Sequence, residues 1–430
     1  MNASPYPALA PTLALAFAVL LLAGLVLKFW LASRQIRHVA RHRASVPAAF
    51  AAQISLASHQ KAADYTLAQM RLGLVETAWG VALTLAWTLL GGLDTLNQAL
   101  LGVVDPGLPQ QLALIVCFMV IGFVLDLPFS LYRTFVLEQR FGFNKMNGRL
   151  WLQDLVKGTL LGALLGLPLA ALVLWMMGAT GAYWWLWTWG VWMGFNLLML
   201  LVYPTWIAPW FNQFKPLDNP ELSQRVDALM QRCGFTAKGF YVMDGSRRSA
   251  HANAYFTGFG RSKRVVFYDT LLAQLSPAEV DAVLAHELGH FSHRHILKRM
   301  ATIFSLSLLG FALLGWLSQQ VWFYQGLGVL PSVTHANDAL ALLLFGMAMP
   351  VVSTFISPMA AQISRRHEFE ADAYAMQHAR GDDLASALLK LYQDNASTLT
   401  PDPVYARFYY SHPPAAERLG RMNPAFATKS

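Results

Sequence analysis

The sequence predicts a mainly α-helical, polytopic membrane protein with seven transmembrane helices and a polar region that carries a small β-sheet. Of its 430 residues, 55% are hydrophobic and only 13% are charged, about half of the roughly 25% typical of soluble domains. Seven apolar segments each reach the length of about 20 residues that a helix needs to cross a bilayer. Polar stretches follow the fifth and the seventh of these segments.

The seven predicted spans are separated by loops whose charge indicates their orientation. The spans are Ala8–Leu31, Leu72–Leu101, Gln111–Phe135, Gly158–Met177, Tyr183–Trp206, Ala301–Phe323 and Asp338–Ala361. Every predicted outer loop lacks Lys and Arg, whereas the longer inner loops are rich in them, so we expect the N-terminus outside and both polar regions in the cytosol. We expect the chain to divide into four parts: 1–211 with five spans, 212–300 as a first catalytic region, 301–361 with two spans, and 362–430 as a C-terminal catalytic segment. Within the first part, residues 47–70 are expected to form a separate cytosolic helix.

Two further features bear on the surroundings of the protein. The net charge of +8 favours contact between basic loops and anionic membrane lipid, with no nucleic-acid partner. The Ala-, Leu- and Trp-rich composition with short loops favours a bacterial inner membrane. Asp126 next to Pro128 in the third span should face protein or a water-filled cavity, although a capped kink at the membrane edge explains it equally well.

The first chemical motif is His-Glu-x-x-His at residues 286–290. On a helix, His286 and His290 lie one turn apart on the same face and can bind one metal ion, while Glu287 beside them can take a proton from a water molecule. Ser276 and Glu279 predict a capping box at the start of this helix. The alternative interpretation is a surface helix with two unrelated histidines.

A zinc hydrolase site needs a third protein ligand, and the sequence offers one far along the chain. Ile296 stands where a third histidine soon after the motif would be expected. Glu368 and Asp372 lie one helical turn apart, so Glu368 could bind zinc and Asp372 could orient a zinc-bound imidazole, whereas Glu370 points elsewhere. A charged, solvated helix is the alternative. Two histidines and one carboxylate favour zinc over manganese or cobalt.

Three other histidines compete for a place in the site. His293 falls on roughly the same helical face as His290 and could support a ligand from behind. His295 and His367 are interpreted as surface histidines near helix ends.

Several blocks from the third span nearly to the C-terminus carry a family resemblance. They are Pro128–Glu138, Phe141–Lys145, Tyr203–Pro209 with Phe211 and Asn212, His251–Phe259, Arg264–Leu272, Ser411–Pro414 and Glu417–Leu419. With the His-Glu-x-x-His motif, they make the chain resemble the type 1 CAAX prenyl proteases, which are integral-membrane zinc metalloproteases. A shorter family of membrane heat-shock proteases shares the zinc motifs, but the blocks around Pro128 and Tyr203 argue against it.

The resemblance implies a fold and a set of zinc-site residues. It implies seven membrane helices that enclose a chamber, with a zincin-like catalytic domain at its cytosolic end. It also implies one Zn²⁺ bound by His286, His290 and Glu368, with Glu287 as the catalytic base.

For the substrate, the resemblance implies that Asn253 and His412 face the scissile region. Asn253 would hold the peptide backbone, and His412 would donate to the oxyanion, although the His-Pro-Pro sequence at 412–414 is equally typical of a rigid surface turn. The strands around Tyr255 and Val265 could offer an edge to an extended peptide.

The leading functional hypothesis is therefore a membrane zinc endopeptidase acting on a peptide or protein substrate. In the family this substrate is a C-terminally prenylated CAAX protein that is cut after the lipidated cysteine. A quality-control protease for membrane proteins is the first alternative. A transporter or channel would suit the polytopic build but has no need of the two metal motifs, and a proteolytically dead scaffold conflicts with the intact catalytic positions.

Overall fold

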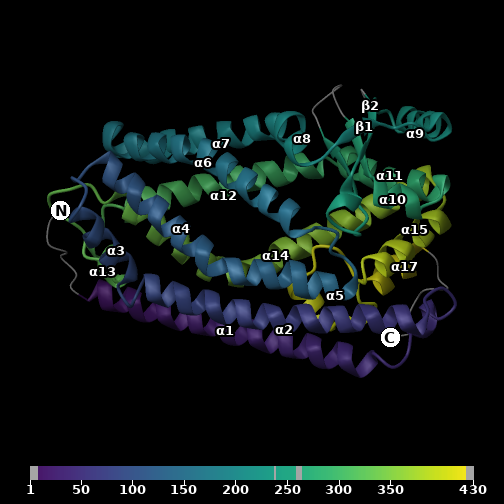
Figure 1. Ribbon diagram of the computed structural model, residues 1–430, viewed down its shortest axis with the longest axis horizontal. Coiled ribbons are helices and arrows are strands. Elements are labelled where there is room, and N and C mark those ends of the chain that lie inside the picture. Colours follow the sequence, from purple (N-terminus) through teal and green to yellow (C-terminus); the bar gives the residue numbers. More distant parts are fainter. Residues whose placement is uncertain (1–7, 237–238, 258–263, 423–430) are drawn as a thin grey trace.

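The computed structural model describes residues 8–236, 239–257 and 264–422. Residues 258 and 259 of the block around Tyr255 lie outside the described ranges. The long helices extend along the long axis of the molecule, and the β-sheet gathers with several shorter helices at one end (Figure 1). The start of α1 lies at the opposite end.

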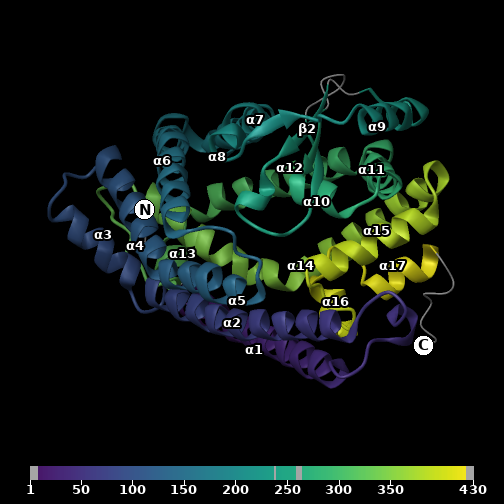
Figure 2. The same cartoon turned by 45° about the vertical axis from the view of Figure 1, so that its right-hand side comes forward.

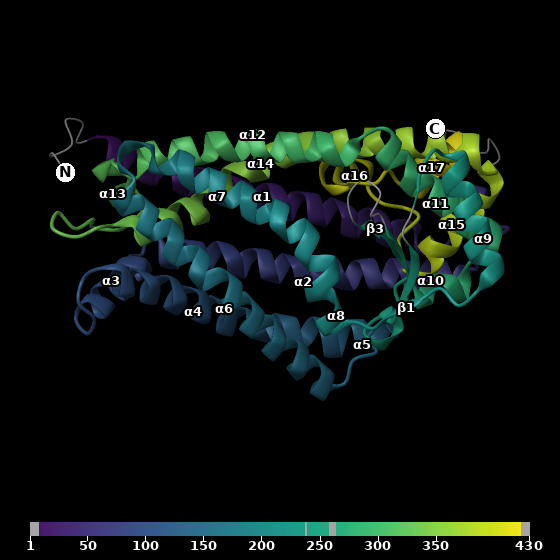
Figure 3. The ribbon, with the colours of Figure 1, turned by 90° about the horizontal axis from the view of Figure 1, so that it is seen from above.

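Within the described residues, six helices are long and apolar enough to cross a membrane, and a bent pair of helices makes a seventh if the pair is counted as one span. The six contain α1 (Leu9–His42), α4 (Leu108–Tyr132), α6 (Gly148–Ala179), α7 (Trp184–Val202), α12 (His295–Leu317) and α14 (Asp338–His378). The bent pair is α2 (Leu56–Trp87) and α3 (Gly92–Leu101), which meet at an angle of 49°. Seen from above, these helices lie side by side along much of the molecule (Figure 3). The predicted mainly α, polytopic architecture is thus confirmed.

The second predicted span is wrong in its details. The chain does not form a separate helix over 47–70, because α2 begins at Leu56 and continues without a break to Trp87. The span also does not continue straight to Leu101. Gly91 adopts a left-handed conformation with a φ of 77°, and an added Cβ on Gly92 would lie only 2.6 Å from the Ala86 carbonyl oxygen. These two glycines let the chain turn sharply between α2 and α3.

Helix α14 is longer than its predicted span. It continues from Asp338 to His378 even though Pro350 and Pro358 lie within it. The seventh apolar span and the acidic motif around Glu368 therefore belong to one helix. This continuity ties the position of Glu368 to the membrane part of the molecule.

Two π-helical segments occur where apolar helices approach the polar region. Arg133–Glu138 follows α4 and leads into α5 (Gln139–Phe141), and Tyr203–Ile207 follows α7 and leads into α8 (Ala208–Phe211). Both fall within the sequence blocks described above, and π-helical turns are frequently found near functional sites. Pro128 lies inside α4 and does not end it, and Asp126 is exposed on that helix.

A four-stranded sheet forms the centre of the polar region. Its strands are β1 (Phe214–Pro216), β2 (Gly239–Met243), β3 (Ala254–Thr257) and β4 (Arg264–Tyr268), in the order β1-β2-β4-β3. The β2 and β4 strands are parallel, and the other two pairs are antiparallel. Tyr255 pairs with Val266, and β3 lies at an edge of the described sheet, as expected for the Tyr255 strand. The expectation was wrong for the Val265 strand, because β4 lies between β2 and β3 and has no open edge.

Helices from both polar stretches share a hydrophobic core with this sheet. They are α9 (Pro220–Arg232), α10 (Asp269–Gln274), α11 (Pro277–Ser292), α15 (Gly381–Asp394) and α17 (Ala415–Met422). Shorter elements are α13 (Val321–Gly326), α16 (Pro403–Tyr409) and the 3-10 turns Ala48–Phe50, Gly181–Tyr183 and Gly245–Arg247. Figure 2 shows α11, α15 and α17 grouped at the same end of the molecule as the sheet.

One hydrophobic core joins the two polar stretches. Val265 on β4 and Leu288 on α11 belong to the same buried cluster as Leu384 on α15 and Leu419 on α17. Phe50, from the segment after α1, completes this cluster and is fully buried. The burial of these side chains against one another brings the two metal-binding motifs, which are about 80 residues apart in sequence, into one structure.

Candidate metal centre

Helix α11 carries the His-Glu-x-x-His motif, and its start is fixed as the sequence predicts. The Ser276 backbone N–H donates to Glu279 Oε2 at 2.7 Å, and the Glu279 backbone N–H donates to Ser276 Oγ at 3.4 Å. The predicted capping box is therefore present. Glu279 also accepts hydrogen bonds from Ser386 and Lys390 on α15, which anchors the helix start to its neighbour.

A close contact between α11 and α14 brings the motif to its third partner. A Cβ added to Gly289 would lie 2.8 Å from Ala371 Cα and 3.0 Å from the Ala371 carbonyl oxygen. Only a glycine permits this approach without movement of the α14 backbone. Since Gly289 lies between the two histidines and Glu368 lies near Ala371, the contact sets the distance between the candidate ligands.

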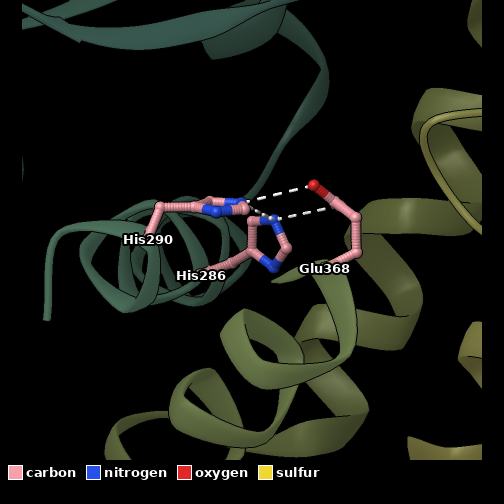
Figure 4. Close-up of side chains that lie close together, drawn as sticks. All are labelled: His286, His290 and Glu368. Carbon is pink, nitrogen blue, oxygen red and sulfur yellow. Dashed lines mark hydrogen bonds and ion pairs between the residues drawn. The ribbon is translucent and has the colours of Figure 1, made fainter. Parts of the chain in front are cut away.

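Three side chains converge at this contact. His286 Nε2 and His290 Nε2 are 3.3 Å apart, and they lie 3.6 Å and 3.3 Å from the nearest carboxylate oxygens of Glu368. Figure 4 shows the two imidazoles from α11 and the carboxylate from α14 pointing toward one another. His286 and Glu368 are buried, and His290 is partly buried. The residues that the sequence analysis selected as metal ligands are therefore brought together.

The arrangement fits a bound metal ion better than a set of hydrogen bonds. Two nitrogens bound to one tetrahedral zinc at about 2.0–2.1 Å would lie about 3.3 Å apart. Glu368 Oε2 is buried and makes no well-aligned hydrogen bond within the described residues, although His412 Nδ1 lies 2.7 Å away. A buried carboxylate whose two oxygens face two imidazole nitrogens, with one oxygen lacking such a bond, has the chemistry of a metal ligand.

The far nitrogen of His286 is held by a buried ion pair. His286 Nδ1 lies 2.8 Å from Asp372 Oδ1, which places Asp372 where the sequence analysis expected an orienting carboxylate. Arg418 on α17 donates to both oxygens of Asp372, at 2.6 and 2.9 Å. Burial opposes the charge on Arg418, but these bonds raise its pKa, so it stays a cation. The sequence analysis did not assign Arg418 a role, because nothing in its spacing marks it.

His290 Nδ1, on the side of the ring away from Glu368, contacts His295. This contact corrects the interpretation of His295 as a surface histidine. His295 is only 5% exposed, so it is not a surface histidine. Its Nδ1 lies 3.0 Å from His290 Nδ1, and its Nε2 lies 2.9 Å from Glu370 Oε2. Arg294 adopts a left-handed conformation, with a φ of 55°, between α11 and α12, and this turn is followed directly by His295. Sequence spacing alone does not reveal such a turn.

The other two histidines lie beside this pair. His367 stacks on His295, with ring centroids 4.0 Å apart, and is partly buried. His293 Nδ1 lies 3.0 Å from the Gly289 carbonyl oxygen, so it contacts the backbone of the motif helix. Glu370 points away from the three candidate ligands, as expected, but toward His295.

Glu287 and His412 border the cluster from different elements. Glu287 is next to His286 on α11, is partly buried, and makes no hydrogen bond or ion pair with any part of the chain that the structure describes. His412 lies in the turn before α17, and its side chain is 63% exposed. It points at the Glu368 carboxylate, so it is placed beside the metal cluster as well as in a surface turn.

Tyr255 lies on the edge strand β3, and Asn253 directly precedes this strand. Asn253 is exposed, and its backbone carbonyl accepts a hydrogen bond from the Tyr268 backbone N–H at 3.0 Å. Burial raises the pKa of Tyr255 to about 12, so its hydroxyl keeps its proton near neutral pH and can donate a hydrogen bond. Within the described ranges, neither residue makes a hydrogen bond or ion pair with the three candidate ligands.

The loop that leads into β3 contacts the π-helical segment Arg133–Glu138 through His251. His251 Nδ1 lies 3.1 Å from Asn395 Oδ1, and its ring stacks on Phe143 at 4.4 Å. Its Nε2 lies 3.7 Å from Glu138, which also accepts a hydrogen bond from the Tyr65 hydroxyl at 2.6 Å. These contacts connect α2 and the π-helical segment to the loop that carries His251 and leads through Asn253 into β3.

Comparison with known proteins agrees with the architecture and the enzyme class. A family model described as the CAAX prenyl protease N-terminal region with five membrane helices matches residues 35–213, and peptidase family M48 matches residues 216–424. The CAAX prenyl protease 1 homolog of Arabidopsis thaliana is 36% identical over 69% of this chain and 69% of its own length. CAAX prenyl protease 1 of Saccharomyces cerevisiae is also 36% identical, over 70% of this chain and 69% of its own length.

A solved structure extends this likeness to nearly the whole fold. The crystal structure of S. mikatae Ste24p superposes with a TM-score of 0.89 at 29% identity, covering 96% of this chain and 99% of that chain. The helices and the His/Glu cluster define a membrane-embedded metallopeptidase. The chain belongs to the type 1 CAAX prenyl protease (Ste24) family and is a metalloendopeptidase. The family and enzyme class predicted from sequence are thus confirmed.

Proposed function

We propose that the protein is a zinc endopeptidase in which His286, His290 and Glu368 bind one Zn²⁺ and Glu287 is the catalytic base. The observation that carries this proposal is the convergence of two imidazole Nε2 atoms, 3.3 Å apart, on the two oxygens of the buried Glu368 carboxylate, one of which lacks a well-aligned hydrogen bond within the described residues. Zinc, when bound there, supplies a Lewis acid that polarises the peptide carbonyl and makes water more acidic.

Glu287 performs the proton transfers in this proposal. Its carboxylate is partly buried, beside a candidate ligand, and free of hydrogen bonds or ion pairs within the described residues. It can therefore accept a proton from the attacking water. The same carboxyl group then returns the proton to the amine that leaves when the peptide bond breaks, so the base is restored at the end of the cycle.

Other residues of the chain orient the ligands and the substrate. Asp372, held by Arg418, fixes the His286 ring through Nδ1, so that Nε2 presents its lone pair. His412, beside Glu368 and largely exposed, is positioned to donate to the oxyanion once substrate displaces its contact with the carboxylate. Among the described strands, β3 pairs with β4 alone, and this edge position supports binding of an extended peptide by strand addition, with Asn253 and Tyr255 as contacts to it.

The substrate class follows from the names of the relatives. We infer that a C-terminal CAAX peptide with a prenylated cysteine is cut, because the relatives above are CAAX prenyl protease 1 proteins. A second candidate is a quality-control protease with non-prenylated membrane substrates, which would use the same chemistry. Strand addition supports it, because this mode of binding recognises the peptide backbone more than its side chains.

The placement in the membrane is part of the proposal. Loops rich in Lys and Arg on one side support a cytosolic catalytic region built from 212–300 and 362–430, with the N-terminus outside. The composition and short loops support a bacterial inner membrane as the location.

The test is cleavage of a farnesylated CAAX peptide and its unprenylated twin by the purified, detergent-solubilised protein. We expect wild type to cut the farnesylated peptide, and Glu287→Gln to lower kcat by about 10²- to 10⁴-fold while retaining its zinc. Glu221→Gln, an exposed carboxylate on α9, is the matched control and should leave kcat unchanged. Chelator treatment of wild type should abolish cleavage.

Three outcomes would change the proposal. Equal cleavage of both peptides would favour the quality-control alternative. A Glu287→Gln variant with wild-type kcat would exclude Glu287 as the base. A wild-type protein that binds no zinc would contradict the metal site itself.

A further inference from the structure

A second cluster of possible metal ligands lies directly behind His290. One ligand atom each from His295, His367 and Glu370 lies within 4.8 Å of the others, and the set again combines two imidazoles with a carboxylate. These residues have the composition of a second zinc site. Two features of the geometry point to a different role.

The first feature is the single proton between two facing nitrogens. His290 Nδ1 and His295 Nδ1 are 3.0 Å apart, so one of them must donate a hydrogen and the other must accept it. When His290 binds metal through Nε2, its own hydrogen is on Nδ1, and His295 Nδ1 must be the acceptor. A neutral His295 then carries its hydrogen on Nε2, which donates to Glu370 Oε2 at 2.9 Å. That nitrogen has no lone pair left for a second metal.

The second feature is the stacking of the two histidines in this cluster. The rings of His295 and His367 have centroids 4.0 Å apart and an interplanar angle of 11°. Imidazole lone pairs lie in the ring plane, so in nearly parallel stacked rings they lie in two separate, nearly parallel planes. They cannot converge on one ion unless a ring rotates.

We propose that His295 and Glu370 are positioning residues that fix the tautomer and orientation of His290, and that their cluster binds no metal while the catalytic site is loaded. The inference rests on the proposed metal site at His286, His290 and Glu368. The hydrogen-bonded chain from His290 through His295 to Glu370 is the counterpart of the chain from His286 through Asp372 to Arg418.

The surroundings of the chain support this role. His295 is 5% exposed, so water does not compete strongly for its ring nitrogens. Glu370 Oε1 lies 3.5 Å from Arg366 Nε, one turn earlier on α14, which holds the carboxylate in place. Since α14 also carries Glu368, the acceptor at the end of the chain and the third ligand move together.

The experiment measures zinc per chain and the zinc dissociation constant by competition with a chelator, in full-length protein in detergent. We expect one zinc per wild-type chain. Glu370→Ala should weaken zinc binding by about 10-fold or more, within the 10- to 100-fold range typical of such hydrogen-bond partners. Glu370→Gln keeps an acceptor oxygen for His295 and should stay close to wild type. His367→Ala, which lies in the cluster but outside the chain, should bind zinc within about twofold of wild type.

Each other outcome overturns the inference in a distinguishable way. Two zinc ions in wild type, with one lost in His367→Ala, would establish a second metal site instead. Unchanged affinity in Glu370→Ala, or equal weakening by Ala and Gln, would exclude the acceptor role while leaving the proposed function intact. A wild-type chain that binds no zinc would refute the proposed function, and this inference with it.

Discussion

His286 and His290 lie one turn apart on the same helix, yet they are supported very differently. Behind His286, the partner is a buried ion pair of Asp372 and Arg418, each side chain at most 6% exposed. Behind His290, the partner is a neutral histidine, His295, that leads to a carboxylate whose side chain is 33% exposed. One proposed ligand is therefore held by interior charge, and the other by a chain of hydrogen bonds that reaches the surface.

This difference predicts which side tolerates change. A buried charge that loses its partner carries a large desolvation cost, whereas a partly exposed carboxylate can be replaced by water. The His286 side should therefore control folding as well as metal binding. The His290 side should mainly adjust metal affinity, as proposed for Glu370.

Removal of the Asp372 side chain is the change expected to have the largest effect on stability and zinc binding. Asp372→Ala leaves Arg418 buried without its main partner, and breaking a buried pair in this way costs about 3–5 kcal/mol of stability. We expect a large fall in Tm together with weaker zinc binding. Asp372→Asn keeps an acceptor for His286 and should lose less zinc affinity than Asp372→Ala. Thermal unfolding and chelator competition check both, and a Tm within 1–2 °C of wild type for Asp372→Ala would contradict the buried-pair account.

A second substitution affects the surroundings of both His286 and His290. Gly289→Ala places a methyl group within about 3 Å of the α14 backbone at Ala371, so one helix must move. Overpacking of this kind costs about 1–3 kcal/mol, and the movement separates Glu368 from both histidines. We expect weaker zinc binding and a lower kcat, measured on one preparation. Gly73→Ala, at a glycine with open space around it, is the matched control.

The smallest expected effect concerns the start of the same helix. Burial alone would raise the pKa of Glu279, but hydrogen bonds from Lys390 and Ser386 lower it below the ordinary 4.5. A carboxyl group whose pKa is lower in the folded state stabilises the fold above its unfolded pKa, and this contribution is lost as pH falls through the folded value. The Tm of wild type should therefore fall further between pH 6 and pH 4 than the Tm of Glu279→Gln. Parallel melting curves test this, and identical pH slopes would exclude the contribution.

The sequence was most informative where the chemistry depends on local spacing. The separation of His286 and His290 by four residues, the capping box at Ser276 and the pairing of Glu368 with Asp372 all follow from the geometry of one helix. The apolar segments likewise predicted a polytopic fold, because hydropathy reports directly on membrane insertion. The structure places each of these residues on the predicted type of element.

The residues that the sequence did not assign depend on contacts between distant elements. His295 becomes a partner of His290 through a left-handed turn at Arg294, and Arg294 is not a residue type that predicts such a turn. Arg418 reaches Asp372 only because α17 packs into the shared core. The continuity of α14 from the membrane to Glu368 was also missed, because the predicted span ends at Ala361, where the apolar segment gives way to the charged stretch that carries Glu368.

The central claim is that Glu368 completes the metal site with the two histidines of α11. The most direct test is the zinc content of purified Glu368→Ala compared with wild type and with Glu370→Ala, which removes a carboxylate two residues away on the same helix. We predict one zinc per chain in wild type, retention of zinc at saturating metal in Glu370→Ala, and near-complete loss in Glu368→Ala. Full zinc occupancy in Glu368→Ala, or loss only in Glu370→Ala, would contradict the account.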